Sequence, residues 1–330
     1  MQLSKEKNKF SMKRFAQQNS ALIAFVILFV VSVLIKGKTF LNLGNIISVL
    51  QNNATIGIIS LGMMLIIITA GMDLSVGSML AALGLIGLAV LNHTNSILLA
   101  FLACILAGAI FGLITGAFVA QFTIPAFIVT LGTMRIYRSL AEYACQGGGI
   151  TATVSHADKF INISNSSVIG IPIPVIIWAV LGLVIWVVAN KTAFGRHVYA
   201  VGSNQKATFL SGINVKRVLV FVYIIGGMLV AVASMLEASR LGSINSASSG
   251  LNYEMDAIAA TVIGGTDLFG GKGTVSGTIF GTLTLGIINN LMNLLGMPSF
   301  LVGAVKGAII IIAVLMQRAF NSQSENVSTN

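Results

Sequence analysis

The sequence predicts an all-α, polytopic membrane protein of about ten transmembrane helices with both termini in the cytoplasm. Its 330 residues are 56% hydrophobic and only 8% charged, whereas a soluble domain has about a quarter charged residues. A helix needs about 20 apolar residues to cross a bilayer, so a chain of this length has room for roughly ten such helices. We therefore expect a protein embedded in the lipid bilayer, without a separate soluble domain.

Ten apolar runs separated by polar loops are the expected spans. They cover residues 20–35, 46–67, 75–91, 97–120, 126–144, 172–190, 218–239, 256–265, 274–293 and 300–317. The run at 256–265 is too short to cross a bilayer unaided, so we expect a half-helix that enters and turns back within protein. The transmembrane domain then extends over 20–318, between cytoplasmic tails at 1–19 and 319–330.

Basic residues give the predicted orientation, because cytoplasmic loops carry an excess of lysine and arginine. With the N-terminus inside, twelve basic residues of loops and tails lie on the cytoplasmic side and four on the outer side. The inner set is Lys5, Lys7, Lys9, Lys13, Arg14, Lys191, Arg196, Lys206, Lys216, Arg217, Lys272 and Arg318, and the outer set is Lys36, Lys38, Lys159 and Arg240. This distribution accounts for the net charge of +10, so we expect no nucleic acid as a partner.

The polar loop after the sixth span contains basic residues and no acidic one. Its middle predicts one short helix, with Ser203 or Asn204 as the N-cap and Gly212 at its end. A helix of under about 12 residues is marginal in water, yet this one presents Phe209 and Leu210 to an aqueous compartment. A protein that docks on the basic side of the membrane explains this. A solvated loop whose charges only fix topology is the alternative.

The pattern G-x-D-L-x-x-G occurs twice, each time between an Ile/Thr/Val-rich run and a further span. Parallel internal repeats are typical of transporters. Chance, or a common helix-capping arrangement with Asp as the N-cap, is the alternative explanation. The repeated positions are Gly71, Asp73 and Gly77 in the first copy and Gly265, Asp267 and Gly271 in the second.

Amide side chains are the main polar groups within the predicted spans. Asn289, Asn290 and Asn293 stand near the outer end of the ninth span, and Asn52 stands near the start of the second. Amides both donate and accept hydrogen bonds, which suits an uncharged polar solute such as a sugar on a translocation pathway. Hydrogen bonding between neighbouring helices is the alternative for any single amide.

Two helix-face patterns indicate structural roles. Gly108, Gly112 and Gly116 recur every four residues and would let another helix approach closely. Arg135, Arg138 and Glu142 are spaced for an internal ion pair in the fifth span.

Catalytic chemistry is not indicated. His93, His156 and His197 are scattered over loops on both sides and share no metal-ligand spacing, and Lys272 is followed by glycine where a phosphate-binding loop needs serine or threonine. Cys104 and Cys145 imply no disulfide framework. We expect no enzyme activity, metal or cofactor in this chain.

Four segments carry a family resemblance: TAGMDLSVGS at 69–78, PAFIVTLGTMRIYRSLA at 125–141, FGRHVYAVGSNQKATFLSGINV at 194–215 and TVIGGTDLFGGKGTVSGTIFG at 261–281. Together they resemble the ribose-type permease subunits of bacterial ABC sugar importers, and the match runs through nearly all of 20–318. Ser139 and Asp267 depart from the family, which often has glycine and serine there.

The resemblance implies a permease in the bacterial inner membrane that translocates a pentose, hexose or related polar solute. It implies three kinds of partner: a cytoplasmic ATPase that hydrolyses the ATP, a second permease chain as homodimer or paralogue, and a periplasmic sugar-binding protein. The segment 191–217 matches the loop that couples to the ATPase, with Gly195, Arg196, Gly202, Asn204, Ala207, Phe209, Leu210 and Gly212 as its matching residues.

Two other functions stay open. The same architecture serves nucleosides, branched-chain amino acids or signalling sugars. An ion-coupled secondary transporter is the runner-up from another class, and it would need charged residues deep in the membrane. Asp73 and Asp267 stand at predicted span ends, which favours the ATP-driven importer.

Overall fold

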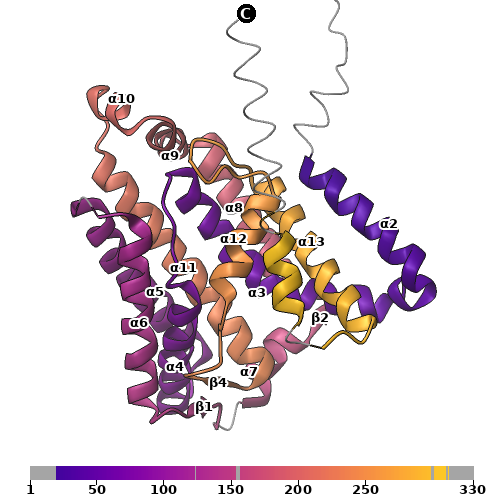
Figure 1. Cartoon of the computed structure of the whole chain (residues 1–330). Coiled ribbons are helices and arrows are strands. Elements are labelled where there is room, and N and C mark those ends of the chain that lie inside the picture. Colours follow the sequence, from indigo (N-terminus) through magenta and orange to yellow (C-terminus); the bar gives the residue numbers. More distant parts are fainter. Residues whose placement is uncertain (1–19, 123, 154–156, 299–300, 310, 312–330) are drawn as a thin grey trace, which may run out of the picture.

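The computed structural model describes residues 20–122, 124–153, 157–298, 301–309 and 311, which form a helical bundle (Figure 1). The long helices are α2 (Ser20–Phe40), α3 (Leu43–Ile68), α4 (Val76–Thr94), α5 (Ile97–Gln121), α6 (Ala126–Ala144), α8 (Ile173–Lys191), α11 (Val215–Leu241) and α13 (Val275–Leu294). The shorter helices are α7 (Ala157–Asn165), α9 (Ala193–Ser203), α10 (Gln205–Leu210) and α12 (Tyr253–Ile263), and residues 301–309 are also helical.

The described strands form two small antiparallel sheets. β1 (Gly149–Thr151) pairs with β4 (Ser243–Asn245), with Ile150 opposite Ile244. β2 (Ser167–Val168) pairs with β3 (Ile171–Pro172). Figure 1 shows α9 and α10 at one end of the bundle and α7, β1 and β4 at the other. These are called the α10 end and the α7 end below.

The prediction of an all-α polytopic membrane protein is confirmed, whereas the number of ten spans stays a prediction. Within the described residues, seven helices are long and apolar enough to cross a membrane: α2, α3, α4, α5, α8, α11 and α13. α6 covers the predicted span but carries three charged residues. α12 has only 11 residues, and much of the last expected span, like both predicted tails, lies outside the described residues.

Close packing of α5 on α11 confirms the role expected for the glycine face. A Cβ on Gly108 would lie 2.8 Å from the Ala231 Cβ, and one on Gly116 would lie 2.8 Å from the Tyr223 Cβ. Gly112, between them, abuts the Tyr223 backbone. The two helices can approach this closely only because glycine replaces larger side chains along the contact.

Arg138 has a different partner from the one expected. Its Nη1 donates to the carbonyl oxygens of Ser246 at 2.7 Å and Ser249 at 2.9 Å. The salt bridge found within the described part of the chain joins other residues, so the expected ion pair in α6 is wrong. The guanidinium instead satisfies carbonyls of the irregular segment that leads from β4 into α12, which a bilayer interior requires of non-helical backbone.

α12 has the short length expected of a half-helix. The backbone before it packs on the start of α4, where Gly250 touches Gly77 and a Cβ on Gly77 would lie 2.6 Å from Glu254 Oε2. α4 itself begins only after the segment from Thr69 to Ser75. Two helices therefore begin next to each other inside the bundle, which the irregular segments before them make possible.

Candidate functional site

A polar cavity of about 220 Å³ lies between α3, α12 and α13, and we call it the amide pocket. Its lining residues are Val49, Asn52, Asn53, Ile56, Tyr253, Asp256, Gly286, Asn289, Asn290 and Asn293. It lies toward the α7 end, because the neighbouring Gln51 donates from Nε2 to the Ser164 carbonyl oxygen of α7 at 2.7 Å. The structure thus brings together all four amides that the sequence suggested for a pathway.

Helix geometry explains how amides distant in sequence meet here. Asn289 and Asn293 are one turn apart and therefore share a face of α13. Gly286, one turn earlier, lets α13 approach α3 closely, since a Cβ there would lie 2.6 Å from the Asn53 Cγ. A larger residue at position 286 would push the two walls of the pocket apart.

The amides differ in how far their hydrogen bonds are satisfied. Asn290 exchanges two hydrogen bonds with Asn45 of α3, at 2.7 and 3.1 Å. Asn53 donates to the Val49 carbonyl oxygen within its own helix at 2.6 Å. Asn52 accepts from Nη1 of Arg240. The structural explanation of the amides, hydrogen bonding within and between helices, therefore holds for these three.

Asn289 and Asn293 differ from these three amides. Oδ1 of Asn289 is buried and has no hydrogen-bond partner among the described residues, and Asn293 is exposed at the pocket. A buried acceptor without a donor is unfavourable by about 1–3 kcal/mol. A hydroxyl group entering the pocket would supply the missing donor.

Sequence reasoning missed an ion pair beside this pocket. Lys306 Nζ donates to both carboxylate oxygens of Asp256, at 2.9 and 3.0 Å, and the side chains are only 21% and 18% exposed. The signal was present, because Lys306 is a lone cation within a predicted span, and ionisable groups there are rare and paired. The pair crosslinks α12 to the helical residues 301–309.

The polar segment 191–217 folds into two helices, where the sequence predicted one. α10 is the expected helix, with Asn204 as its N-cap: Oδ1 accepts from the Ala207 amide at 3.0 Å. Gly212 follows it with a φ of +81°. The unexpected helix is α9, capped by Thr192, whose hydroxyl accepts from the Gly195 amide at 3.1 Å.

The apolar side chains of α10 are free of the bundle. Phe209 is 69% exposed and Leu210 84% exposed. Both line an open groove of about 1240 Å³ that extends to the α5–α6 connection, with Phe122 and Ile124 on its far side. Exposed apolar side chains around a groove are typical of a protein–protein contact.

The other predicted residues of this segment have distinct surroundings. Gly195 is buried against the end of α8, where a Cβ would lie 2.5 Å from the Ala189 carbonyl carbon. Gly202 is packed against the end of α3 and the loop before α13. Arg196 is exposed and donates to the Thr192 carbonyl oxygen at 3.3 Å. Gly195 and Gly202 let α9 pack closely on neighbouring backbone, whereas Arg196 lies on the exposed surface of this helix.

The two G-x-D-L-x-x-G copies share one turn and then diverge. Asp73 Oδ1 accepts from the Ser75 amide at 2.8 Å, and Asp267 Oδ1 accepts from the Phe269 amide at 3.0 Å, the same bond from residue i+2. Neither aspartate is the N-cap residue, because Ser75 and Thr274 precede the helices. The capping alternative is therefore wrong.

The remaining repeat positions are not equivalent. Gly77 lies inside the first turn of α4, whereas Gly271 has a φ of +76° in a loop. Gly265 has a φ of +84°, while in the first copy the positive φ, +58°, belongs to Ala70, one residue before Gly71. The structural likeness is thus confined to the aspartate turn.

Comparison with known proteins gives several full-length relatives. A ribose import permease of Haemophilus influenzae is 39% identical over 95% of this chain and 97% of its own. A galactose/methyl galactoside import permease of the same organism is 37% identical over 94% and 96%. A D-allose transport system permease of Escherichia coli K12 is 33% identical over 95% of each chain. No solved structure matches the chain.

A family model agrees with these relatives. It matches residues 45–314, which include every helix from α4 to α13 and both walls of the amide pocket. The family is described as the permease component of the branched-chain amino acid transport system. This chain therefore belongs to that family of membrane permeases, together with the ribose, galactoside and allose import permeases.

Proposed function

We propose that this chain is the membrane-spanning subunit of an ATP-binding-cassette importer that translocates a neutral sugar across a bacterial inner membrane. The α10 end would face the cytoplasm and the α7 end the periplasm, as the bias of basic residues indicates. The names of the relatives, which are import permeases for ribose, galactosides and allose, support this substrate class.

The amide pocket is the observation that carries the proposal. A polar cavity inside an apolar bundle is unfavourable unless it serves a solute or its water, and intramembrane polar groups mark pathways for this reason. Asn289 offers an acceptor without a donor. The pathway residues we propose are Asn52, Asn289, Asn290 and Asn293, with Asn290 positioned by Asn45.

The exposed face of α10 supports an ATPase as a partner. Phe209 and Leu210 stand on a helix of six residues with its own cap, which is too short to persist alone in water. An ATPase that buries them would stabilise α10 and connect ATP hydrolysis to the bundle. A second permease chain would complete the pathway, and a periplasmic binding protein would dock at the α7 end and deliver the sugar.

Reconstitution tests the proposal. The chain is placed in liposomes with the ATPase and the binding protein encoded beside it, and uptake of labelled ribose, galactose and allose is followed with ATP inside or outside the vesicles. We expect uptake of at least one sugar that requires both partners and ATP on the α10 side. Uptake driven by a proton or sodium gradient without ATP would refute the proposal.

One observation favours an ion-coupled transporter as a second candidate. Glu237 of α11 is 2% exposed and Asp73 is 3% exposed, so carboxylates do lie deep in the bundle. Glu237 Oε2 is buried and has no hydrogen-bond partner among the described residues, whereas Asp73 accepts from the Ser75 hydroxyl at 2.6 Å. The Ser75 contact gives Asp73 a structural role, so Glu237 is the carboxylate that an ion-coupled transporter would use. Uptake measured with an ion gradient and no ATP decides between the two functions. Uptake of other labelled solutes, such as nucleosides and branched-chain amino acids, tests the substrate class.

A further inference from the structure

α9 lies in contact with the end of α3 and with the loop before α13, which are far apart in the sequence. Gly202 packs against the end of α3, and a Cβ there would lie 2.6 Å from the Gly271 amide nitrogen. The Gly271 amide in turn donates to the Ile68 carbonyl oxygen at 2.8 Å. Any displacement of α9 therefore directly meets the backbone of α3 and of the loop before α13.

One side-chain hydrogen bond joins α9 to the loop before α13. The Tyr199 hydroxyl donates to the Gly273 carbonyl oxygen at 2.8 Å. Burial raises the pKa of the Tyr199 phenol, so the hydroxyl keeps its proton and remains a donor at neutral pH. The neighbouring loop backbone is equally confined, because a Cβ on Gly273 would lie 2.8 Å from the Ile68 Cγ1.

The loop held by α9 connects directly to the amide pocket. Thr274, next to Gly273, is the N-cap of α13, and its hydroxyl accepts from the Gly277 amide at 3.1 Å. α13 then continues as one helix from Val275 to Asn289, about 21 Å further along at 1.5 Å per residue, and to Asn293, about 27 Å further along. A shift at its first residue is therefore carried to the pocket.

α12 is packed against α13 so closely that the two helices must move together. A Cβ on Gly264, at the end of α12, would lie 2.6 Å from the Gly277 carbonyl carbon, and one on Gly281 would lie 2.8 Å from the Gly264 amide nitrogen. Such backbone contact leaves no space for sliding. α12 and α13 therefore act as one unit, and this unit provides Tyr253, Asp256 and the α13 amides of the pocket.

α9 and α10 are also closely joined. Asn204 is both the C-cap of α9 and the N-cap of α10, so no flexible linker separates them. Thr208 of α10 donates from its hydroxyl to the Asn204 carbonyl oxygen at 2.8 Å. A force on the exposed face of α10 therefore acts on α9 through a single residue.

From this geometry we infer that Tyr199 is a positioning residue that couples movement of α10 to the α12–α13 unit, and through it to the amide pocket. The inference rests on the proposed function, and it adds a transmission route that begins at α9. The hydrogen bond from the Tyr199 hydroxyl to Gly273 is the contact in this route that removal of one oxygen atom, in Tyr199→Phe, abolishes. The steric contact at Gly202 is its second element.

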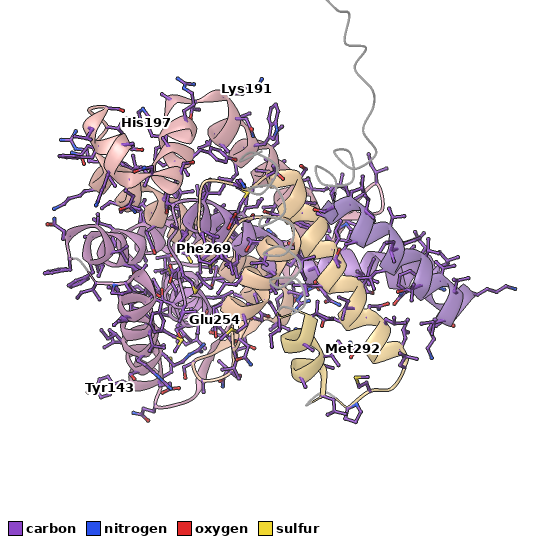
Figure 2. All side chains as sticks on the ribbon, turned by 45° about the horizontal axis from the view of Figure 1, so that its top comes forward. Tyr143, Lys191, His197, Glu254, Phe269 and Met292 are labelled. Carbon is purple, nitrogen blue, oxygen red and sulfur yellow. The ribbon has the colours of Figure 1, made fainter. Side chains whose placement is uncertain are left out.

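The test uses Tyr199→Phe in the complete complex with ATPase and binding protein, in proteoliposomes. Sugar uptake and ATP hydrolysis are measured on the same vesicles. We expect ATPase association and basal hydrolysis to match the parent chain, and the unfolding temperature to fall by no more than one lost hydrogen bond causes. Uptake per ATP should fall about two- to tenfold, the shift in equilibrium that one lost hydrogen bond allows. Tyr143→Phe is the matched control, because Tyr143 is 86% exposed at the far end of α6 (Figure 2).

A second readout follows the pocket itself. Asn293→Cys is introduced with Cys104 and Cys145 replaced by alanine, and its rate of labelling by a thiol reagent is compared with and without ATP. We expect ATP to change this rate in the parent background and to change it less when Tyr199→Phe is added.

The outcomes separate this inference from the proposed function. If the parent complex shows no ATP-dependent uptake, the proposed function fails and the coupling role with it. If the parent transports and Tyr199→Phe gives the same uptake per ATP as Tyr143→Phe, the coupling role alone is refuted. A Tyr199→Phe chain that loses ATPase association, or whose unfolding temperature falls by much more than one lost hydrogen bond causes, would show a purely structural bond, which also refutes it.

Discussion

Leu210→Glu tests whether α10 is the docking surface for an ATPase. Leu210 is 84% exposed, so the substitution removes little packing within the chain. Burying a whole leucine side chain contributes about 1.5–3 kcal/mol, so a partner that covers the exposed part gains ~1.3–2.5 kcal/mol from it. Losing this contribution weakens docking about tenfold to seventyfold. The buried carboxylate adds a desolvation cost to that loss, so we expect association and uptake to be abolished.

Co-purification and binding measurements decide the outcome. The chain and its Leu210→Glu variant are purified in detergent, and ATPase affinity is measured on immobilised permease. Ile169→Glu is the control, because Ile169 is 97% exposed in the turn between β2 and β3, at the α7 end. Membrane insertion should be unchanged in both variants. Normal ATPase affinity in Leu210→Glu, or an equal loss in Ile169→Glu, would refute the docking role of α10.

Three further predictions concern topology, the pathway and the ion pair. Ser203→Cys should react with an impermeant thiol reagent only after the inner face is exposed, and Ser167→Cys should react in intact cells; the reverse pattern would invert the orientation. Asn293→Leu should slow uptake without changing which sugar competes, and an altered competition profile would place selectivity in the permease. Lys306→Met should lower the stability of the purified chain by about 1–3 kcal/mol, because it leaves the partly exposed Asp256 carboxylate without its partner. Adding Asp256→Asn should restore most of that loss in thermal unfolding, and no such recovery would contradict the pairing.

The sequence predicted the helices well, because apolar runs and capping residues are signals that lie within a short stretch of chain. The run of apolar residues located the long helices, and Asn204 and Gly212 marked the two ends of α10. α9 was missed because Gly195 and Gly202 suggest a loop. Both glycines are in fact required where the helix meets other backbone. The buried residues Val198 and Val201 already had helical spacing and could have indicated it.

The candidate site was predictable in residue type but not in pairing. Intramembrane amides could be named from the sequence, and the structure does place them around one pocket. Which of them are already satisfied depends on contacts such as Asn45 with Asn290, 245 positions apart. One sequence contains no signal for such a pairing. The expected pairing of Arg138 with Glu142 failed for the same reason, because carbonyls over 100 positions away compete for the guanidinium.

The charges around the amide pocket bear on which solutes it can accept. Asp256 is the charged residue of the lining, and both of its oxygens bond to Lys306, so this pair presents no net charge to the cavity. Arg240 is not a lining residue, and its guanidinium bonds to Asn52. A charged solute would give up its hydration for neutral dipoles, which is costly, whereas a hydroxylated neutral solute exchanges hydrogen bonds with water for hydrogen bonds with amides. With Asn290, Asn53 and Asn52 already engaged, Asn289 and Asn293 offer few contacts to such a solute. Few contacts give transient binding and weak discrimination, so we expect selection among neutral sugars to depend on a separate protein that docks at the α7 end.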